Sequence, residues 1–335
     1  MDKEVVVIIP TLNEEKYINA CIESVQAQTY PFEKVDVIVV DGGSTDRTRD
    51  IVHELSNKMD NIRLINNPGK IQSIAFNLGV ANSTAPFVIR LDAHTTYDEN
   101  YIALCVQHLK ASDKYGNVGG ICVIKAQNDT MMAKASMILN QSKFGIGGSQ
   151  FRVGTKAACV DTVPFGAFRR DVIEKVGGMR EDMPRAEDNE INSRLSKNGY
   201  SIYLDPKIVS SYYARDTFSG CIKQMYNNGV SIGHLFYVDR NAIGLRHFVP
   251  FLFVIGIAVG LLLSFCVQWI KYLFVPVLLL YMLLNIIATV YECRKYGWRY
   301  LFILPWLFFS VHIAYGVGTI VGLFKYFNYT KRGSK

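Results

Sequence analysis

Three long apolar runs without charged residues, in the last third of the chain, limit what this sequence can fold into. They span residues 248–267, 272–290 and 300–324 of a 335-residue chain. At a rise of 1.5 Å per residue, each helix would be about long enough to cross a hydrocarbon core of roughly 30 Å. Buried core helices are the alternative, but three such runs in succession favour the membrane. We therefore predict a soluble α/β domain over residues 1–240 and a membrane anchor over 241–335.

Basic residues recur around the three runs, which suits a surface of anionic headgroups. They are Arg240, Arg246, Lys271, Arg294, Lys295, Arg299, Lys325, Lys331 and Arg332. Three spans with the large domain inside would put the basic tail at 325–335 outside, against the positive-inside tendency. Two solutions stay open: the tendency is overridden, or one run is re-entrant or lies in the interface. Pro276 and Pro305 are compatible with bent segments.

The remaining composition indicates a cytoplasmic face and no nucleic-acid partner. The sequence starts Met1-Asp2-Lys3-Glu4, without a basic n-region or a cleavage site, so the large domain is expected in the cytoplasm beside a bacterial inner or plasma membrane. The seven cysteines are scattered and form no Cys-x-x-Cys pair, which predicts neither zinc nor a disulfide framework. The net charge of +7 comes with no basic, aromatic-interleaved helix of the nucleic-acid-binding kind.

The N-terminal part alternates β-branched runs with amphipathic stretches. Strands are predicted at 5–9, 35–40, 62–65 and 87–91, with helices near 15–28, 46–55 and 71–80 between them. This order predicts right-handed crossovers and a Rossmann-like, mostly parallel sheet. No Gly-x-Gly-x-x-Gly follows a strand, so a dinucleotide cofactor is not expected. Further on we predict a strand at 118–124, an extended segment at 160–168, helices at 101–110, 171–176 and 187–198, and a mobile loop over 131–155.

Acidic motifs stand where these predicted elements end or begin. Asp41-Gly42-Gly43-Ser44-Thr45-Asp46 closes the second strand, Asp92-Ala93-His94 closes the fourth, and Glu187-Asp188 opens a helix. Open α/β sheets bind their ligands at the carboxyl ends of parallel strands. Carboxylate and imidazole groups can hold a divalent ion on a diphosphate. The motifs therefore indicate an enzyme that acts on a nucleotide-linked substrate.

Taken together, these motifs resemble family 2 glycosyltransferases with the GT-A fold. The match includes residues 7–14, 41–46, 92–94 and 187–188, and it is nearer to the succinoglycan-type exopolysaccharide subgroup, in which Asp-Ala-His often stands for Asp-x-Asp. Residues 163–170 and 177–179, and His312-x-x-Tyr315-Gly316 in the last apolar run, are similar to that subgroup as well. The resemblance covers nearly the whole chain. The motifs are specific as a set, and none is specific alone.

The resemblance assigns the donor side of the site. Asp41 would bind the uracil or ribose of a UDP-sugar, with Pro10, Thr11 and Glu14 as the facing wall, and Lys70 would contact phosphate or uridine. Simpler roles are open for three of them. Asp41 could form an Asx-turn, Glu14 could be a charge favoured at a helix N-terminus, and Lys70 could be a solvated lysine.

The resemblance also implies a metal site at Asp92 and His94. The ion would be Mg²⁺ or Mn²⁺, shared with the donor phosphates, and it would neutralise the departing nucleoside diphosphate. A histidine in place of a second acid favours Mn²⁺ slightly. The alternative for His94 is a strand-end histidine that binds no metal.

Asp188 is the expected general base. An inverting transfer needs one carboxylate to take the proton of the acceptor hydroxyl as it attacks the anomeric carbon. Glu187 would be the orienting neighbour on the acceptor side. By position alone, two acids in a first helical turn are ordinary, so the assignment depends on the family motif.

Gln224 matches the first residue of the Gln-x-x-Arg-Trp motif of processive synthases, on the acceptor side. Asn227-Asn228 replace the Arg-Trp pair. This departure and the small number of apolar runs argue against a synthase that extrudes a polymer. The segment is instead expected to form an interfacial helix leading to the membrane.

The sequence thus predicts a multi-pass membrane protein that is an inverting glycosyltransferase. It would move one sugar from a nucleotide sugar to a polyprenyl-diphosphate-linked saccharide in exopolysaccharide, capsule or O-antigen synthesis. One alternative transfers the sugar directly to polyprenyl phosphate. Two others are a catalytically inactive membrane scaffold with the same fold and a nucleotidyltransferase, which would not explain Glu187-Asp188 or the apolar runs.

Overall fold

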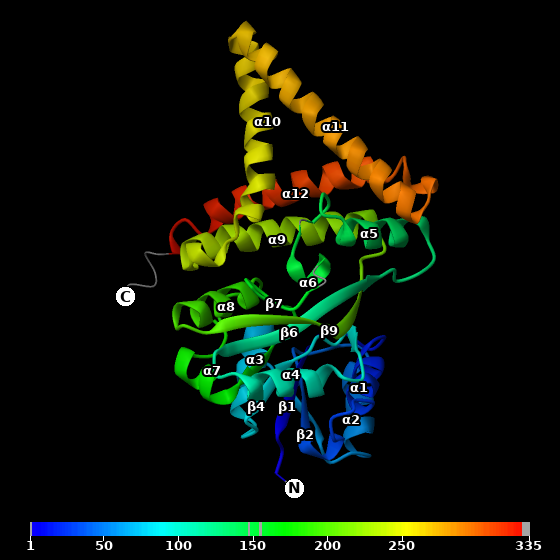
Figure 1. Ribbon diagram of the computed structural model, residues 1–335, viewed down its shortest axis with the longest axis vertical. Coiled ribbons are helices and arrows are strands. Elements are labelled where there is room, and N and C mark those ends of the chain that lie inside the picture. Colours follow the sequence, from blue (N-terminus) through cyan, green and yellow to red (C-terminus); the bar gives the residue numbers. More distant parts are fainter. Residues whose placement is uncertain (1, 147, 154–155, 330–335) are drawn as a thin grey trace. The chain divides into compact units, whose positions relative to one another are not determined.

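The protein folds into two compact units, as a computed structural model shows for residues 2–146, 148–153 and 156–329 (Figure 1). The sheet unit consists of Met1–Val123 and Ser149–Tyr212. The helix unit consists of Ile124–Gly148 and Tyr213–Lys335. The chain therefore passes from one unit to the other three times, and the helix unit is assembled from two separate segments.

Four parallel strands form one half of the sheet, in the order β3-β2-β1-β4. They are β1 (Val5–Thr11), β2 (Val35–Asp41), β3 (Ile62–Asn66) and β4 (Phe87–Arg90). The helices that connect them are α1 (Ile18–Gln26), α2 (Thr48–Ser56) and α3 (Gln72–Ala81). Every residue of β1 and β2 is buried, as expected of β-branched strands covered on both faces. The predicted α/β, Rossmann-like half is confirmed.

Antiparallel pairs extend this half to a mixed sheet of nine strands. Beyond β4 the order continues β8-β6-β9-β5, and β7 pairs with β9. The added strands are β5 (Thr95–Tyr97), β6 (Tyr115–Lys125), β7 (Ala158–Val160), β8 (Ala167–Arg169) and β9 (Ser201–Tyr213). β8 lies antiparallel to β4, with Phe168 opposite Val88. The segment predicted as extended at 160–168 contains the end of β7 and the start of β8, with a loop between them.

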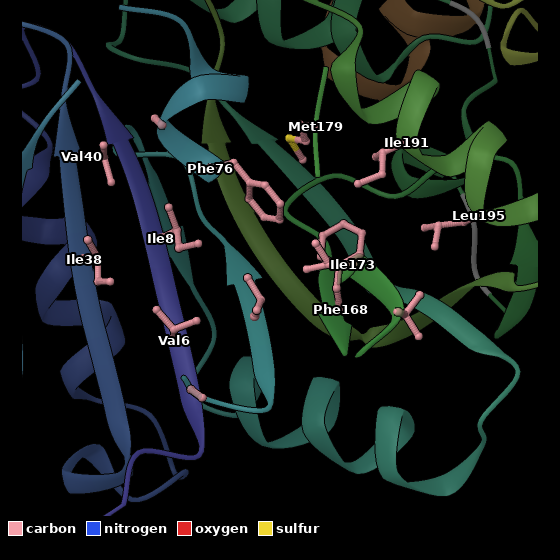
Figure 2. Close-up of a cluster of buried hydrophobic side chains, with 14 residues drawn as sticks. Val6, Ile8, Ile38, Val40, Phe76, Phe168, Ile173, Met179, Ile191 and Leu195 are labelled. Atoms are coloured by element: carbon pink, nitrogen blue, oxygen red, sulfur yellow. The ribbon is translucent and has the colours of Figure 1, made fainter. Parts of the chain in front are cut away.

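The core of the sheet unit locks three helices onto the strands (Figure 2). They are α3, α7 (Arg170–Val176) and α8 (Glu187–Lys197), and α4 (Tyr101–Ala111) is a further helix of this unit. Phe76 of α3 meets Phe168 of β8 edge to face, with ring centroids 5.8 Å apart. Ile191 and Leu195 of α8 are fully buried in the same cluster. This packing fixes the start of α8, which carries Glu187 and Asp188, relative to the central strands.

The predicted mobile loop over 131–155 is wrong for most of its length. Its first part is the helix α5 (Met131–Gln141), and Gln150–Val153 form the short helix α6. Thr130 caps α5 by accepting a hydrogen bond from the Ala133 N–H (3.3 Å). Ile138 and Leu139 of α5 are buried in the core of the helix unit, and this tertiary burial is not visible in the local sequence. Residues 147, 154 and 155 lie outside the described residues.

The described part of the helix unit contains four long helices besides α5. They are α9 (Phe218–Val238), α10 (Phe248–Cys266), α11 (Lys271–Tyr296) and α12 (Leu304–Lys325). Single 3-10 turns occur at Phe32–Lys34, Arg240–Ala242, Leu245–His247, Gln268–Ile270 and Trp298–Tyr300. Three helices, at Leu245–Cys266, Gln268–Tyr296 and Leu304–Lys325, are long and apolar enough to cross a membrane. They coincide with the three predicted apolar runs. The functional division at residue 240 stays a prediction.

Candidate active site

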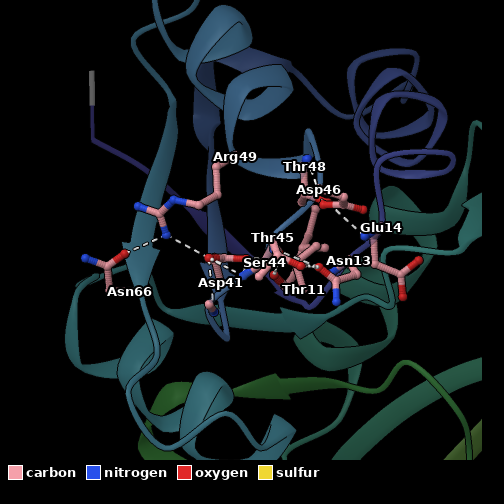
Figure 3. Close-up of polar contacts among 12 residues, drawn as sticks. Thr11, Asn13, Glu14, Asp41, Ser44, Thr45, Asp46, Thr48, Arg49 and Asn66 are labelled. Atoms are coloured by element: carbon pink, nitrogen blue, oxygen red, sulfur yellow. Dashed lines mark hydrogen bonds and ion pairs between the residues drawn. The ribbon is translucent and has the colours of Figure 1, made fainter.

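Asp41, the last residue of β2, is satisfied by its own loop and by one arginine (Figure 3). Its side chain is fully buried and accepts hydrogen bonds from the Gly43 N–H (3.1 Å), the Ser44 N–H (3.2 Å) and the Ser44 hydroxyl (2.5 Å). Arg49 donates to the same carboxylate at 2.7 Å and also holds Asn66 at 2.8 Å. Burial alone would raise the pKa of Asp41, but these hydrogen bonds outweigh it and lower the pKa. Asp41 is therefore an anion that fixes the loop after β2.

A second set of hydrogen bonds joins the loop after β1 to the loop after β2 (Figure 3). The Asn13 N–H donates to the Ser44 hydroxyl, and the Thr45 N–H donates to the Asn13 side-chain oxygen, both at 2.8 Å. The Glu14 N–H donates to the Thr48 hydroxyl at 2.8 Å. These bonds join the two loops, residues 12–17 and 42–47, into one continuous surface, which we call the wall.

The remaining predicted donor-side residues adjoin this wall. Thr11 is the register partner of Asp41, and Pro10 precedes it in the buried strand β1. Lys70 is exposed and follows β3, and its Cα lies 3.5 Å from the position that a Cβ on Gly42 would take. The structure thus brings Pro10, Thr11, Asp41 and Lys70 to the same edge of the sheet.

Two residues with left-handed backbone lie at this edge. The described non-glycine residues with positive φ are Asn13 (57°), Lys70 (60°), Phe165 (50°) and Ala186 (62°). Asn13 and Lys70 belong to the loops just described, and Ala186 directly precedes α8. A left-handed conformation is unfavourable for most side chains and occurs often at functional sites, where the surrounding structure enforces it.

Arg90, the last residue of β4, is the centre of the site. Its side chain is only 4% exposed and donates to Asp188 Oδ1 at 2.7 Å, to Asp92 Oδ1 at 2.9 Å and to Gln72 Oε1 at 2.8 Å. Glu187 Oε1 lies 3.4 Å away. One guanidinium therefore brings Asp92 together with Glu187 and Asp188, which follow it by 95 and 96 residues in the sequence.

The sequence prediction missed Arg90 and treated it as part of an apolar strand. The signal was present, because Arg90 is the one charged residue in a run, 87–91, that is otherwise apolar. An arginine at a position predicted to be buried requires acidic partners. The Nε of Arg90 is buried and has no hydrogen-bond partner among the described residues. The three acids therefore do not use all the N–H donors of Arg90.

Glu187 and Asp188 lie side by side at the start of α8 and differ in environment. Glu187 is buried, and burial raises its pKa to about 7, opposed by Arg90 and reinforced by the charges of Asp188 and Asp92. The Asp188 side chain is 34% exposed, and its Oδ1 is held by Arg90. The pair therefore presents Asp188 outward, while Glu187 is protonated more readily than an ordinary glutamate.

Asp92 and His94 occupy the loop between β4 and β5. The Asp92 carboxylate is 17% exposed and paired with Arg90. His94 Nδ1 lies 3.0 Å from Glu14 Oε1, and its ring meets Tyr212 edge to face at 5.5 Å. A carboxylate on one imidazole nitrogen orients the other for a metal ion. Glu14 is thus a partner of His94 in the structure, a contact that the sequence prediction did not foresee.

A metal ion would need ligands from the substrate at this site. Among the described residues, no three His, Cys, Asp or Glu side chains are grouped so as to hold an ion. Mg²⁺ and Mn²⁺ sites on nucleotides commonly use one or two protein ligands, with phosphate oxygens and water completing the shell. Asp92 and His94 fit an ion shared in this way.

Gln224, the last predicted site residue, lies on α9 in the helix unit.

Replacing Arg90 by methionine should destabilise the protein strongly, because three acids lose their buried counter-charge. We expect Arg90→Met to lower the free energy of unfolding by about 3–5 kcal/mol. The matched control is Arg180→Met, which removes an exposed ion pair with Asp182 and should cost about 0–1 kcal/mol. Chemical unfolding in detergent, followed by far-ultraviolet circular dichroism, measures both. Equal losses for the two variants would contradict the central role of Arg90.

Glu187→Gln should remove a pH dependence of stability. The pKa of Glu187 rises from an ordinary 4.5 to about 7 on folding, so the folded protein holds a proton that the unfolded chain releases. This group therefore costs stability as pH rises between these two values. The melting temperature of Glu187→Gln minus that of the wild type should increase from about pH 5 to about pH 8. A constant difference across this range would show that Glu187 ionises normally.

A profile of the family described as glycosyl transferase family 2 matches residues 6–177. Among curated proteins, the chain is similar to the dolichyl N-acetyl-alpha-D-glucosaminyl phosphate 3-beta-D-2,3-diacetamido-2,3-dideoxy-beta-D-glucuronosyltransferase of Methanococcus voltae. The two are 30% identical over 326 residues, which cover 95% of this chain and 97% of that protein. This chain is also 33% identical to the succinoglycan biosynthesis protein ExoA of Rhizobium meliloti (strain 1021) over 265 residues, which cover 78% of each of the two chains.

Solved structures support the same fold. A mannosyltransferase from Pyrobaculum calidifontis, in complex with GDP-Man and Mn²⁺, matches with a TM-score of 0.61 and 18% identity. The match covers 97% of this chain and 88% of that one. The chain therefore belongs to glycosyl transferase family 2, and it is a glycosyltransferase with a GT-A-like fold.

Proposed function

We propose that this glycosyltransferase transfers one sugar, with inversion, from a UDP-sugar to a saccharide carried on a polyprenyl phosphate or diphosphate. The single observation that carries the proposal is the contact of Arg90 with both Asp92 and Asp188. An acid suited to the donor phosphates and an acid suited to the acceptor hydroxyl lie within reach of one side chain. The name of the Methanococcus relative specifies an acceptor that is a sugar on dolichyl phosphate, which favours a lipid-linked saccharide here.

The donor nucleotide would bind along the wall formed by the loops after β1 and β2. Pro10, Thr11 and Glu14 would form the facing wall of the nucleotide site. Because the Asp41 oxygens are already engaged, we propose that Asp41 holds the loop ready for the uracil and ribose rather than rearranging to bind them. Lys70 is an exposed cation beside this loop and is suited to the diphosphate.

Asp92 and His94 would hold the divalent ion, Mn²⁺ or Mg²⁺. Such an ion stabilises the charge that develops on the departing nucleoside diphosphate. The Pyrobaculum structure contains Mn²⁺ together with its nucleotide sugar, which supports a metal in this chain. Glu14 would set the orientation of the His94 ring, and Arg90 would hold one oxygen of Asp92.

Asp188 would act as the general base. It would take the proton from the acceptor hydroxyl as that oxygen attacks the anomeric carbon from the face opposite the nucleotide. Arg90 fixes its Oδ1 and thereby its orientation, and the partial exposure of the side chain leaves it open to the acceptor side. Glu187 would be the orienting neighbour on that side, and with a pKa of about 7 it would carry a proton more often than an ordinary glutamate.

We further propose that residues 1–240 act in the cytoplasm and that residues 241–335 anchor the protein in the cell membrane. Three helices able to cross a membrane support this division. An anchored enzyme would meet its lipid-linked acceptor at the headgroup level. The relationship to a succinoglycan biosynthesis protein supports a role in exopolysaccharide, capsule or O-antigen assembly.

The proposal is tested by a transfer assay on membranes that contain the protein. Radiolabelled UDP- and GDP-sugars are supplied with Mn²⁺, and label is measured in the solvent-extractable lipid fraction. Asp188→Asn should lower kcat by about 10²–10⁴-fold, because the base is lost, with little change in KM for the donor. Asp60→Asn, an exposed acid of the same unit, should be unchanged.

Each result of this assay decides something. Equal rates for Asp188→Asn and the wild type would exclude Asp188 as base. Label on a lipid monophosphate without an acceptor sugar would favour direct transfer to polyprenyl phosphate. No transfer from any donor, with acceptor lipid present, would favour an inactive scaffold.

Removing the metal should abolish transfer, and the dependence should run through His94. We expect chelation with EDTA to stop the reaction and Mn²⁺ to restore it. His94→Ala should raise the Mn²⁺ concentration for half-maximal rate strongly, and Glu14→Gln should raise it by about 10–100-fold, as expected for a residue that orients a ligand. His53→Ala, an exposed histidine of α2, is the control. An unchanged Mn²⁺ dependence in His94→Ala would remove His94 from the metal site.

A further inference from the structure

The three helices that could cross a membrane are packed in different ways. In the apolar 18-residue stretch of each helix, the share of residues buried inside the protein is 6% for α10 and 11% for α11. For α12 this share is 44%. α10 and α11 expose large apolar side chains along most of their length, as helices surrounded by lipid do. α12 buries Leu304, Phe308 and Val311 in the core of the helix unit and exposes Trp306 and Phe324. One face of α12 is therefore packed in the protein and the other is exposed, although both faces are apolar in sequence.

α12 lies directly against the backbone of α9 (Figure 1). A Cβ on Gly229 of α9 would lie 2.1 Å from the Tyr315 carbonyl oxygen of α12, and one on Gly318 would lie 2.2 Å from the Tyr226 carbonyl oxygen of α9. The contact continues one turn further, where a Cβ on Gly322 would lie 2.3 Å from the Val230 carbonyl oxygen of α9. The two helices thus pack backbone to backbone along several turns, so they are expected to occupy the same environment.

α9 is too polar to cross a membrane. It carries Lys223, Gln224, Asn227, Asn228 and His234 within its 21 residues, and it is not among the described helices that could span. Moving a charged lysine or several amide side chains into hydrocarbon is strongly unfavourable. If α12 crossed the hydrocarbon, it would carry these side chains with it. The pairing with α9 therefore argues against α12 as a span.

α10 and α11 form a hairpin that departs from this pair (Figure 1). The first turn of α10 is packed on α12, where a Cβ on Gly316 would lie 2.3 Å from the Pro250 carbonyl oxygen. Further out, Phe253 stacks on Tyr281 at 4.2 Å, and Phe274 lies against Gly260. The turn that joins the two helices lies at residues 267–270. Each helix has at least 19 residues, about the length required to cross roughly 30 Å of hydrocarbon.

The distribution of charge agrees with a single hairpin. Five basic residues stand at its base: Arg240, Arg246, Arg294, Lys295 and Arg299. The turn has only Lys271. α12 has a basic residue at each end, with Arg299 in the turn before it and Lys325 as its last residue. Since positive residues favour the cytoplasmic side, both ends of α12 belong on the side of the hairpin base.

We propose that α10 and α11 are the only membrane-spanning helices and that the α9–α12 pair lies in the plane of the cytoplasmic interface. The exposed apolar side chains of α12, Trp306, Val317, Val321 and Phe324, would enter the acyl boundary. The basic residues at the hairpin base and at the end of α12 would contact anionic headgroups. The C-terminal residues then return to the side from which the chain entered, and the conflict with the positive-inside tendency disappears.

The test is the sidedness of three introduced cysteines in the full-length protein. The exposed native cysteines Cys159 and Cys266 are first replaced by serine. Single cysteines are then placed at Asn57 in the sheet unit, Gln268 in the hairpin turn and Ser334 near the C-terminus. Each protein is treated with a membrane-impermeant maleimide in inside-out and right-side-out vesicles. Transfer activity, or circular dichroism if no activity is found, shows that each variant is folded.

The expected result is that Ser334→Cys and Asn57→Cys are labelled in the same vesicle orientation and Gln268→Cys in the opposite one. Labelling of Ser334→Cys together with Gln268→Cys would mean that α12 crosses the membrane, and the proposal would fail. Labelling of all three from one side would mean that no helix crosses, and the proposal would fail as well. None of these outcomes depends on the sugar, the acceptor or the catalytic base.

Discussion

The site depends on one buried positive charge. A guanidinium at the end of β4 is removed from water and is stable there only if acids surround it, because the desolvation of an unpaired charge is very unfavourable. Asp92, Glu187 and Asp188 supply these acids from β4's own loop and from α8, and Gln72 adds a contact from α3. The interaction therefore joins the central sheet to two of the helices that pack on it. The same contacts hold the proposed metal ligand and the proposed base on two different nitrogens of one guanidinium.

A second consequence concerns the nucleotide loops, which are ordered by internal hydrogen bonds. Asp41 is saturated by Ser44, Gly43 and Arg49, and Asn13 bridges the two loops. A site already held in its binding geometry loses less conformational entropy when its ligand arrives. The positive φ angles of Asn13 and Lys70 indicate that the surrounding contacts enforce this geometry at some cost in backbone energy.

Much of the fold was predictable from local sequence, and most of what was missed depends on contacts between distant residues. The continuous β-branched runs of β1 and β2 predicted the parallel half of the sheet, and the acids at the strand ends predicted the position of the candidate site. Arg90 was missed because its partners Glu187 and Asp188 are almost a hundred residues away. α5 was missed because a Gly- and Ser-rich segment follows it, whereas the burial of Ile138 and Leu139 against distant helices decides its conformation. The contact of Glu14 with His94 also joins two separate loops and has no local signal.

The interleaved path of the chain has a consequence for how such a protein can be divided. The helix unit includes Ile124–Gly148 as well as everything after Tyr213, and its core packs Leu139 of α5 with Leu304 and Phe308 of α12. A protein that ended at residue 240 would keep α5 and lose the helix that covers it, and a large apolar face would then be open to water. The segment after residue 240 is for this reason not an exchangeable tether. A homologue that recombined at this point with a different C-terminal segment would have to acquire a new cover for α5 at the same time, so the sheet unit and the helix unit are expected to have been inherited together.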